Sequence, residues 1–165
     1  MDHRIEVKKS FWVIGKFITV SKENHPIDLI PGFWKESHQN GFIRELIAMA
    51  ANDEDIQTGK NCLLGICAGG NESGSFNYWI AVESQQDTVS ASLKKLEIPA
   101  STWAVFTSTG AMPLTIQDLW QKIFTEFLPG SAYKHAPSPE IEFYPEGDVD
   151  SPEYICEIWI PVEPK

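Results

Sequence analysis

The sequence lacks any apolar run long enough to cross a lipid bilayer. A membrane-spanning helix needs about 20 consecutive apolar residues, and no stretch of this 165-residue chain approaches that length. The opening residues, MDHRIEVKKS, are too polar for a secretory signal peptide. We therefore expect a cytoplasmic protein that has no membrane partner.

Metal-binding patterns are also missing. The three cysteines, Cys62, Cys67 and Cys156, are odd in number and lack the paired spacing of a zinc site, and the four histidines form neither HxxxH nor HExxH. We expect no metal and no cofactor. The cysteines are expected to be unpaired core residues in a reducing compartment, because a disulfide framework needs an oxidising one.

Positive charge is scarce. The chain has 13 Lys and Arg residues against 23 Asp and Glu residues, which gives a net charge of −10. Such a charge repels a phosphate backbone, and no basic stripe compensates for it. We expect no direct binding to nucleic acid, and the sequence identifies no protein partner.

Familiar catalytic patterns are absent as well. There is no Ser-His-Asp or Cys-His constellation to suggest nucleophilic catalysis. The Gly-rich GICAGG at 65–70 lacks the GxxxxGK[ST] pattern of a phosphate loop, and a strand follows it where that loop needs a helix. A hairpin turn is the better interpretation of this segment.

A globular composition and an internal repeat are what the sequence does contain. Hydrophobic residues make up 42% and charged residues 22%, which suits one folded domain of this length. The segment YWIAVE at 78–83 resembles IWIPVE at 158–163, so that Trp79 matches Trp159. The repeat predicts two units of similar architecture.

The same order of elements leads to both segments. The strand-like runs 11–20 and 101–109 are each followed by a helical segment and then by a hairpin, whose turns are GGNESG and PEGDVDSP. The first helix is expected to begin near Pro31 and to break or bend at Gly41. The second ends at Pro129-Gly130 and has one apolar stripe, formed by Ile116, Leu119, Trp120, Ile123, Phe124 and Phe127.

We therefore predict an α+β fold made of a tandem repeat of two strand-helix-strand-strand units that share an antiparallel sheet. The predicted halves are about 4–84 and 95–163, and a polar linker at about 85–94 joins them in a single domain covering 1–165. Two packed modules leave a groove where they meet, and such clefts are frequent ligand sites.

Three runs in the second half carry a family resemblance: IPASTWAVFTSTG, TIQDLWQKIFTEFLPGSAY and EIEFYPEGDVDSPEYICEIWIPV. They resemble the GyrI-like small-molecule-binding domain, also called the AraC-type effector-binding domain. The first half resembles it through the repeated architecture and PGFWKE. The resemblance implies a central groove, lined by aromatic side chains around a glutamate, that binds organic and often cationic molecules. Because the chain begins directly with the first strand, the resemblance implies a stand-alone domain.

Two glutamates are candidates for the acid of this groove. Strand alternation places Glu157 on one face with Ile155 and Trp159, while the apolar residues between them form the other face. From the residues alone, Glu157 either faces solvent or is kept for a ligand. The resemblance favours the ligand, since Glu157 in CEIWIPV matches the family's glutamate. Glu142 in PEIEFYP matches an acid used by its multidrug regulators.

The aromatic candidates have a structural and a functional interpretation. Trp34 and Trp120 occupy similar places on the two predicted helices, where a tryptophan either packs in a core or lines a groove. His38, one helical turn from Trp34, is interpreted as a surface residue. The predicted ligand-binding set is Glu157, Trp159, Glu142, Tyr144, Trp34, Trp120, Tyr78 and Phe106.

Three classes of function follow. The first is a non-enzymatic binder of a hydrophobic, cationic small molecule, which serves drug sensing or sequestration, as in multidrug binding and transcription regulation. Aromatic faces and a carboxylate are what a delocalised cation needs. The second, implied by the resemblance, is a hydrolase with Glu142 or Glu157 as base and Tyr144 as donor. The third is a protein-binding inhibitor such as a gyrase modulator.

Overall fold

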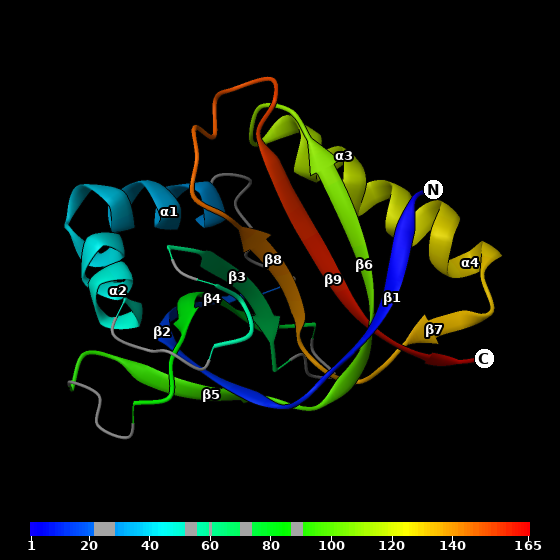
Figure 1. Cartoon of the computed structure of the whole chain (residues 1–165), viewed down its shortest axis with the longest axis horizontal. Helices are drawn as coiled ribbons and strands as arrows, with labels where there is room; N and C mark the ends of the chain where they lie inside the picture. The colour runs from blue at the N-terminus through cyan, green and yellow to red at the C-terminus, as the bar shows by residue number, and fades with distance from the viewer. Residues whose placement is uncertain (22–28, 52–55, 60, 70–73, 87–90) are drawn as a thin grey trace.

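The computed structural model describes residues 1–21, 29–51, 56–59, 61–69, 74–86 and 91–165. Most of the predicted turn GGNESG and part of the predicted linker lie outside the described residues. Runs of strands are separated along the chain by two runs of helices, which form two groups in space (Figure 1).

The strands in chain order are β1 (His3–Lys8), β2 (Phe11–Val20), β3 (Leu63–Ala68), β4 (Phe76–Glu83), β5 (Lys94–Ile98), β6 (Ser101–Thr109), β7 (Tyr133–His135), β8 (Glu140–Tyr144) and β9 (Ile155–Pro164). The helices are α1 (Leu29–Gln39), α2 (Phe42–Ala50), α3 (Leu114–Lys122), the π-helical segment η1 (Ile123–Phe127) and α4 (Leu128–Gly130). In the part of the chain that the structure describes, this is the predicted α+β architecture, which is confirmed.

The strands form an antiparallel sheet in the order β1-β6-β9-β8-β3-β4-β2-β5, and β7 pairs with the end of β9. This order is symmetric about the β8–β3 pair. Trp79 of β4 pairs with Ile66 of β3, and Trp159 of β9 pairs with Ile141 of β8, so the two tryptophans hold corresponding places. The leading strand of each half, β1 in the first and β5 in the second, pairs with a strand of the other half: β1 with β6, and β5 with β2.

Both helical groups cover the same face of the sheet. On β4, Ile80 packs in one cluster with Leu46 of α2, and on β9, Ile158 packs with Ile123 of η1. Ile80 pairs with Gly65 of β3, Gly65 pairs with Glu142 of β8, and Glu142 pairs with Ile158. Residues that pair directly lie on the same face of a sheet, so Ile80 and Ile158 share one face. Full burial of such a side chain is worth roughly 1.5–3 kcal/mol.

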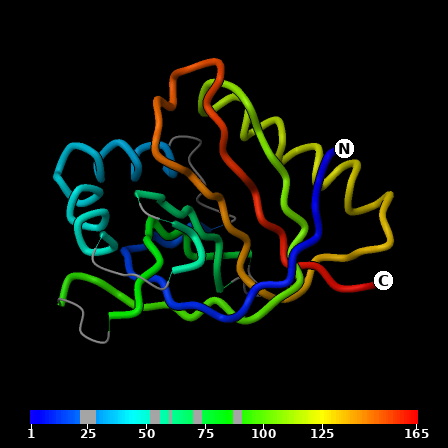
Figure 2. The backbone as a smooth tube through the Cα atoms, in the orientation of Figure 1, coloured from blue at the N-terminus to red at the C-terminus, as the bar shows by residue number. Residues whose placement is uncertain are grey.

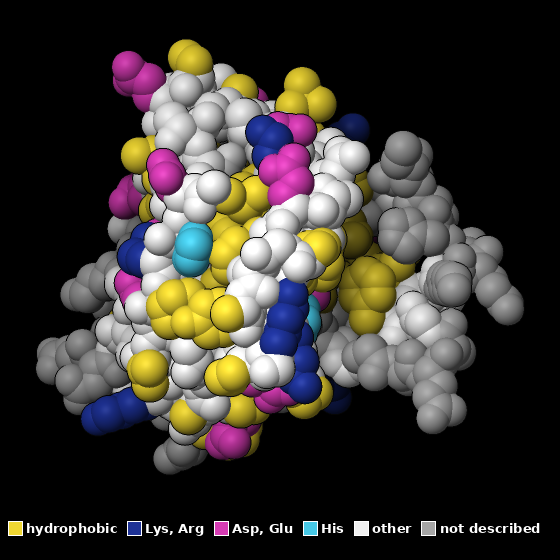
Figure 3. Space-filling model, turned by 90° about the vertical axis from the view of Figure 1, so that its right-hand side faces the viewer, with side chains coloured by type: hydrophobic (Ala, Val, Ile, Leu, Met, Phe, Trp, Pro, Cys, Tyr) yellow, Lys and Arg dark blue, Asp and Glu magenta, His cyan; other side chains and the backbone are white. Residues whose placement is uncertain are grey.

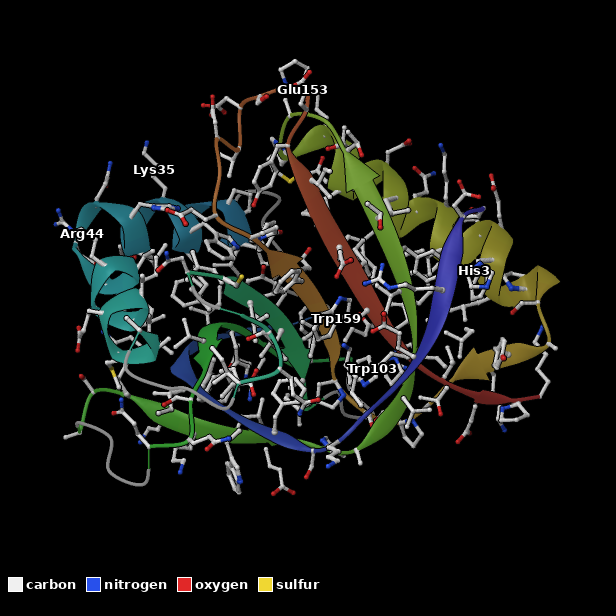
Figure 4. All side chains as sticks on the ribbon, in the orientation of Figure 1. His3, Lys35, Arg44, Trp103, Glu153 and Trp159 are labelled. Atoms are coloured by element: carbon white, nitrogen blue, oxygen red, sulfur yellow. The ribbon has the colours of Figure 1, made fainter. Side chains whose placement is uncertain are left out.

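The other face of the sheet bends around a second core to which strands from both ends contribute. Trp103 of β6 is fully buried there, and its ring centroid lies 6.1 Å from that of Trp159. Both side chains lie close together near the middle of the molecule (Figure 4). As a result, the central strands are buried on both faces.

The breaks in the helices follow from local sequence. Gly41 separates α1 from α2 and has a φ of 84°, a left-handed conformation that glycine adopts without steric cost. This confirms the predicted break. The last helical segment ends at Gly130, as predicted, but a π-helical segment interrupts the long helix.

Strand β5 was not predicted. It begins where the predicted linker at about 85–94 ends, and it pairs with β2 at one edge of the sheet. The strand has little apolar pattern by which it could be predicted, because three of its five residues are Lys94, Lys95 and Glu97. It also pairs with a strand that is distant in sequence.

Both termini lie on the side of the molecule that carries β7 and α4 (Figure 2). On that side, hydrophobic side chains are exposed among charged ones (Figure 3). Among the described residues, none of the helices has the length and apolar character that crossing a membrane requires.

Candidate functional site

A cavity of about 810 Å³ opens on the helix-covered face of the sheet. Its walls come from α1 and α2 on one side and α3 on the other, and its floor comes from the central strands β3, β4 and β8. The volume lies within the range of roughly 300–1,000 Å³ that is typical of small-molecule sites. The cavity exists because the two helical groups cover the two ends of the sheet and leave its centre open.

Glu142 of β8 lies at the floor of the cavity and is only 9% exposed. Tyr78 Oη donates to Glu142 Oε1 at 2.5 Å, and Trp120 Nε1 donates to Oε2 at 2.8 Å. Tyr144 lies two residues along the same strand and also lines the cavity. Trp34 Nε1 donates to Tyr78 Oη at 2.9 Å, so a tryptophan from each helical group joins a network centred on Glu142.

A glycine makes this network sterically feasible. Gly65 of β3 lies opposite Glu142 in the sheet register. A Cβ at position 65 would stand 2.3 Å from Tyr78 Oη and 2.6 Å from Glu142 Oε1. The space above Gly65 is therefore where the hydroxyl and the carboxylate meet. Sequence analysis missed this residue, whose only signal was a glycine inside an apolar strand.

Burial sets the ionisation of these groups. It raises the pKa of the Glu142 carboxyl, while the hydrogen bonds from Tyr78 and Trp120 act in the opposite direction. Burial, together with the nearby Glu142 carboxylate, also raises the pKa of Tyr78 and of Tyr144 well above the usual tyrosine value. Both hydroxyls therefore keep their protons, and the Tyr78 hydroxyl donates to Glu142.

The charged side chains around the cavity are mostly acidic. Glu140 and Glu146 line it together with Glu142, and among the described lining residues none is Lys or Arg. His135 Nε2 lies 2.8 Å from Glu140 Oε1, and Asn61 Nδ2 donates to Glu146 Oε2 at 3.1 Å. The cavity therefore presents negative potential to a ligand, and the net charge of −10 has the same sign.

The structure brings five of the predicted site residues together. Glu142, Tyr144, Tyr78, Trp34 and Trp120 all line the cavity. The ring centroids of Trp34 and Tyr144 lie 5.2 Å apart in an edge-to-face arrangement. Glu142, one of the two candidate bases of the hydrolase hypothesis, and its donor Tyr144 lie two residues apart on β8.

Glu157 and Trp159 lie elsewhere, on the opposite face of the sheet. Trp159 Nε1 donates to Glu157 Oε1 at 2.9 Å, and Arg4 Nη2 from β1 contacts Glu157 Oε2 at 2.7 Å. Lys8 Nζ lies 4.5 Å from the centroid of the Trp159 ring. The carboxylate predicted for a ligand thus already pairs with a cation of the chain. Glu157 faces away from the cavity because successive residues of a strand point to opposite faces, and its neighbours Cys156 and Ile158 face the helices.

Phe106 is also away from the cavity. It is fully buried beneath η1, and its ring centroid lies 4.8 Å from that of Phe127. His38 was interpreted as a surface residue and is exposed, but it lines the cavity as well. Cys67 lines the cavity too, whereas Cys156 is a buried core residue as predicted.

Sequence analysis missed most of the apolar lining, which comes from the helices, from β3, and from the loops before α3 and after β8. These residues are Ile30, Pro31, Ile43, Ile47, Leu63, Met112, Pro113, Ile116, Pro145, Val149 and Tyr154. The described residues contain no group of three or more His, Cys, Asp or Glu side chains arranged to hold a metal ion.

The fold and the cavity together define a small-molecule-binding domain built on one antiparallel sheet. The chain belongs to the GyrI-like family, since residues 1–163 match the GyrI-like small molecule binding domain. A comparison with curated proteins found no match.

Solved structures show the same fold. The structure of SAV2435 bound to tetraphenylphosphonium is 26% identical, with a TM-score of 0.86 over 99% of this chain and 94% of that one. A protein from Staphylococcus aureus MU50 is also 26% identical, with a TM-score of 0.82 over 99% of both chains. The C-terminal domain of EcmrR is 17% identical with a TM-score of 0.60 over 100% of both chains, which is a likeness of fold alone.

Proposed function

We propose that this protein binds hydrophobic organic cations in the cavity, with Glu142 as the counter-charge, and that it senses or sequesters them without chemical conversion. The observation that carries the proposal is the Glu142 carboxylate, 9% exposed at the floor of a largely apolar and aromatic cavity. An unpaired buried carboxylate is costly, and a bound cation supplies the missing charge.

The surrounding aromatic side chains support the same class of ligand. Trp34, Trp120 and Tyr144 place rings around the carboxylate. Each ring face that a cation contacts contributes roughly 0.5–2 kcal/mol through cation–π attraction. The tetraphenylphosphonium bound by SAV2435 combines a delocalised positive charge with four aromatic rings, and that protein has the same fold at 26% identity.

The test is calorimetric titration of Glu142→Gln and the wild type with methyltriphenylphosphonium and with neutral triphenylphosphine oxide. The substitution keeps the side-chain volume and removes the charge, so the cation should lose about 1–3 kcal/mol, roughly five- to more than a hundredfold in affinity. The neutral compound should change little, because its apolar contacts remain.

Glu157→Gln is the matched control. It removes one carboxylate charge from the opposite face of the sheet, where Glu157 pairs with Arg4. Cation affinity should be unchanged in this variant. If Glu142→Gln bound the cation as tightly as the wild type, or if Glu157→Gln caused the larger loss, Glu142 would not be the counter-charge.

A further inference from the structure

Both oxygens of the cavity carboxylate are already occupied by donors of the chain itself. Oε1 of Glu142 accepts the Tyr78 hydroxyl at 2.5 Å, and Oε2 accepts the Trp120 indole N–H at 2.8 Å. A carboxylate offers about four acceptor positions. Donors among the described residues use one position on each oxygen, so half of this capacity is taken before a ligand binds.

These donors are fixed in place. Tyr78 is 2% exposed and is held on its other side by the indole N–H of Trp34, 2.9 Å from its hydroxyl. Gly65 leaves the space in which the Tyr78 hydroxyl reaches Glu142. A ligand that displaced Tyr78 would leave a buried hydroxyl without its acceptor, which costs roughly five- to a hundredfold in affinity.

The charge of Glu142 nevertheless acts on a cation without a hydrogen bond. Coulomb attraction becomes stronger as the distance and the dielectric constant decrease, and a mostly apolar cavity keeps both of them small. A protonated amine entering this cavity gives up its hydrogen bonds to water and finds few acceptors on Glu142. A cation without N–H or O–H groups gives up no such bonds and experiences the same charge.

We infer that the cavity selects cations that carry no hydrogen-bond donor, namely quaternary ammonium, phosphonium and fully alkylated iminium ions, over protonated primary amines of the same skeleton. This inference rests on the proposed function, because it assumes that Glu142 is the counter-charge for a bound cation. It adds that Glu142 acts through its charge and not as a hydrogen-bond acceptor for the ligand.

The experiment compares 2-naphthylmethylammonium with its N,N,N-trimethyl derivative by calorimetric titration, at a pH where the primary amine is fully protonated. The wild type should bind the trimethyl cation more tightly. Three added methyl groups favour any apolar cavity, so the decisive quantity is the change in this affinity ratio between variants. Tyr78→Phe and Trp120→Phe each free one acceptor position on Glu142, and each should shrink the ratio roughly fivefold or more.

Trp34→Phe is the matched control for Trp120→Phe. Both substitutions remove an indole N–H and the same ring area from the cavity wall, but the Trp34 donor goes to Tyr78 and not to the carboxylate. The ratio in Trp34→Phe should stay within about twofold of the wild type. Two informative variants keep the test decisive if one of them does not fold.

The inference is overturned if the wild type binds the primary amine at least as tightly as the trimethyl cation. It is also overturned if neither Tyr78→Phe nor Trp120→Phe changes the ratio. Glu142→Gln, titrated with the trimethyl cation, distinguishes these failures from failure of the proposed function. A loss of affinity there leaves the cation-binding function standing without this selectivity, and no loss removes both.

Discussion

Substitution of Gly65 by alanine tests whether the space above this residue is what holds Tyr78 against Glu142. The added Cβ would lie 2.3 Å from Tyr78 Oη, whereas ordinary van der Waals contact begins at 3.4 Å. The hydroxyl must therefore retreat by about 1 Å, the difference between 3.4 and 2.3 Å. Such a movement breaks its 2.5 Å hydrogen bond to the carboxylate.

The expected cost follows from two effects and one offset. Loss of a hydrogen bond to a charged group costs about 1.5–3 kcal/mol, and overpacking of a tight site costs about 1–3 kcal/mol. Replacing glycine by alanine in a strand also raises the free energy of unfolding by about 0.5–1 kcal/mol, because it lowers the conformational entropy of the unfolded chain. We expect Gly65→Ala to lower the free energy of unfolding by about 1.5–5.5 kcal/mol.

Urea denaturation measures this difference, and Gly130→Ala is the control, since nothing lies within 4 Å of a Cβ at that position. The hydroxyl is the closest obstacle, so Gly65→Ala should cost at least about 1 kcal/mol less in a Tyr78→Phe background than in the wild type. A Gly65→Ala protein within about 0.5 kcal/mol of the wild type would refute the argument.

Two further predictions concern buried carboxylates. Because burial raises the pKa of Glu142 and a bound cation lowers it again, cation affinity should be full above the raised pKa and should fall as pH falls through it. Titrations over a pH series check this, and a parallel loss for a neutral ligand would contradict it. Glu83, 3% exposed, accepts the backbone N–H groups of Gln57 and Thr58 at 2.8 Å each. Glu83→Ala should lower the free energy of unfolding by about 1–3 kcal/mol, more than Glu83→Gln, which keeps an acceptor; equal urea midpoints for the two variants would disprove this.

The sequence was sufficient for the α+β class because the strand-like runs and the helical stripe are local patterns, and the repeat showed that their order occurs twice. Alternation along 155–162 correctly separated the face of Glu157 and Trp159 from that of Ile158 and Ile160. It could not show which face carries the cavity. Both faces of β9 are buried, one against η1 and α3 and the other in the bend of the sheet, so an apolar face did not distinguish core from ligand site.

Glu142 was predicted from the family resemblance, and Tyr144 lies two residues away on the same face of one strand. Gly65 and the apolar helix residues were not predictable in this way. Their roles depend on contacts between strands and helices that are far apart in sequence, such as the pairing of Gly65 with Glu142. The polar edge strand β5 was missed for the same reason.

The crossing of the leading strands has a consequence for how the molecule comes apart. Strand β1 forms the sheet edge beside β6, and β5 forms the edge beside β2. Each unit thus has an edge strand that the other unit supplies. The arrangement resembles a domain-swapped dimer whose two copies are joined in one chain. Neither unit can open without exposing an edge of its neighbour. Unfolding is therefore coupled across the β8–β3 seam beneath the cavity, and a ligand bound at that seam stabilises both units at once.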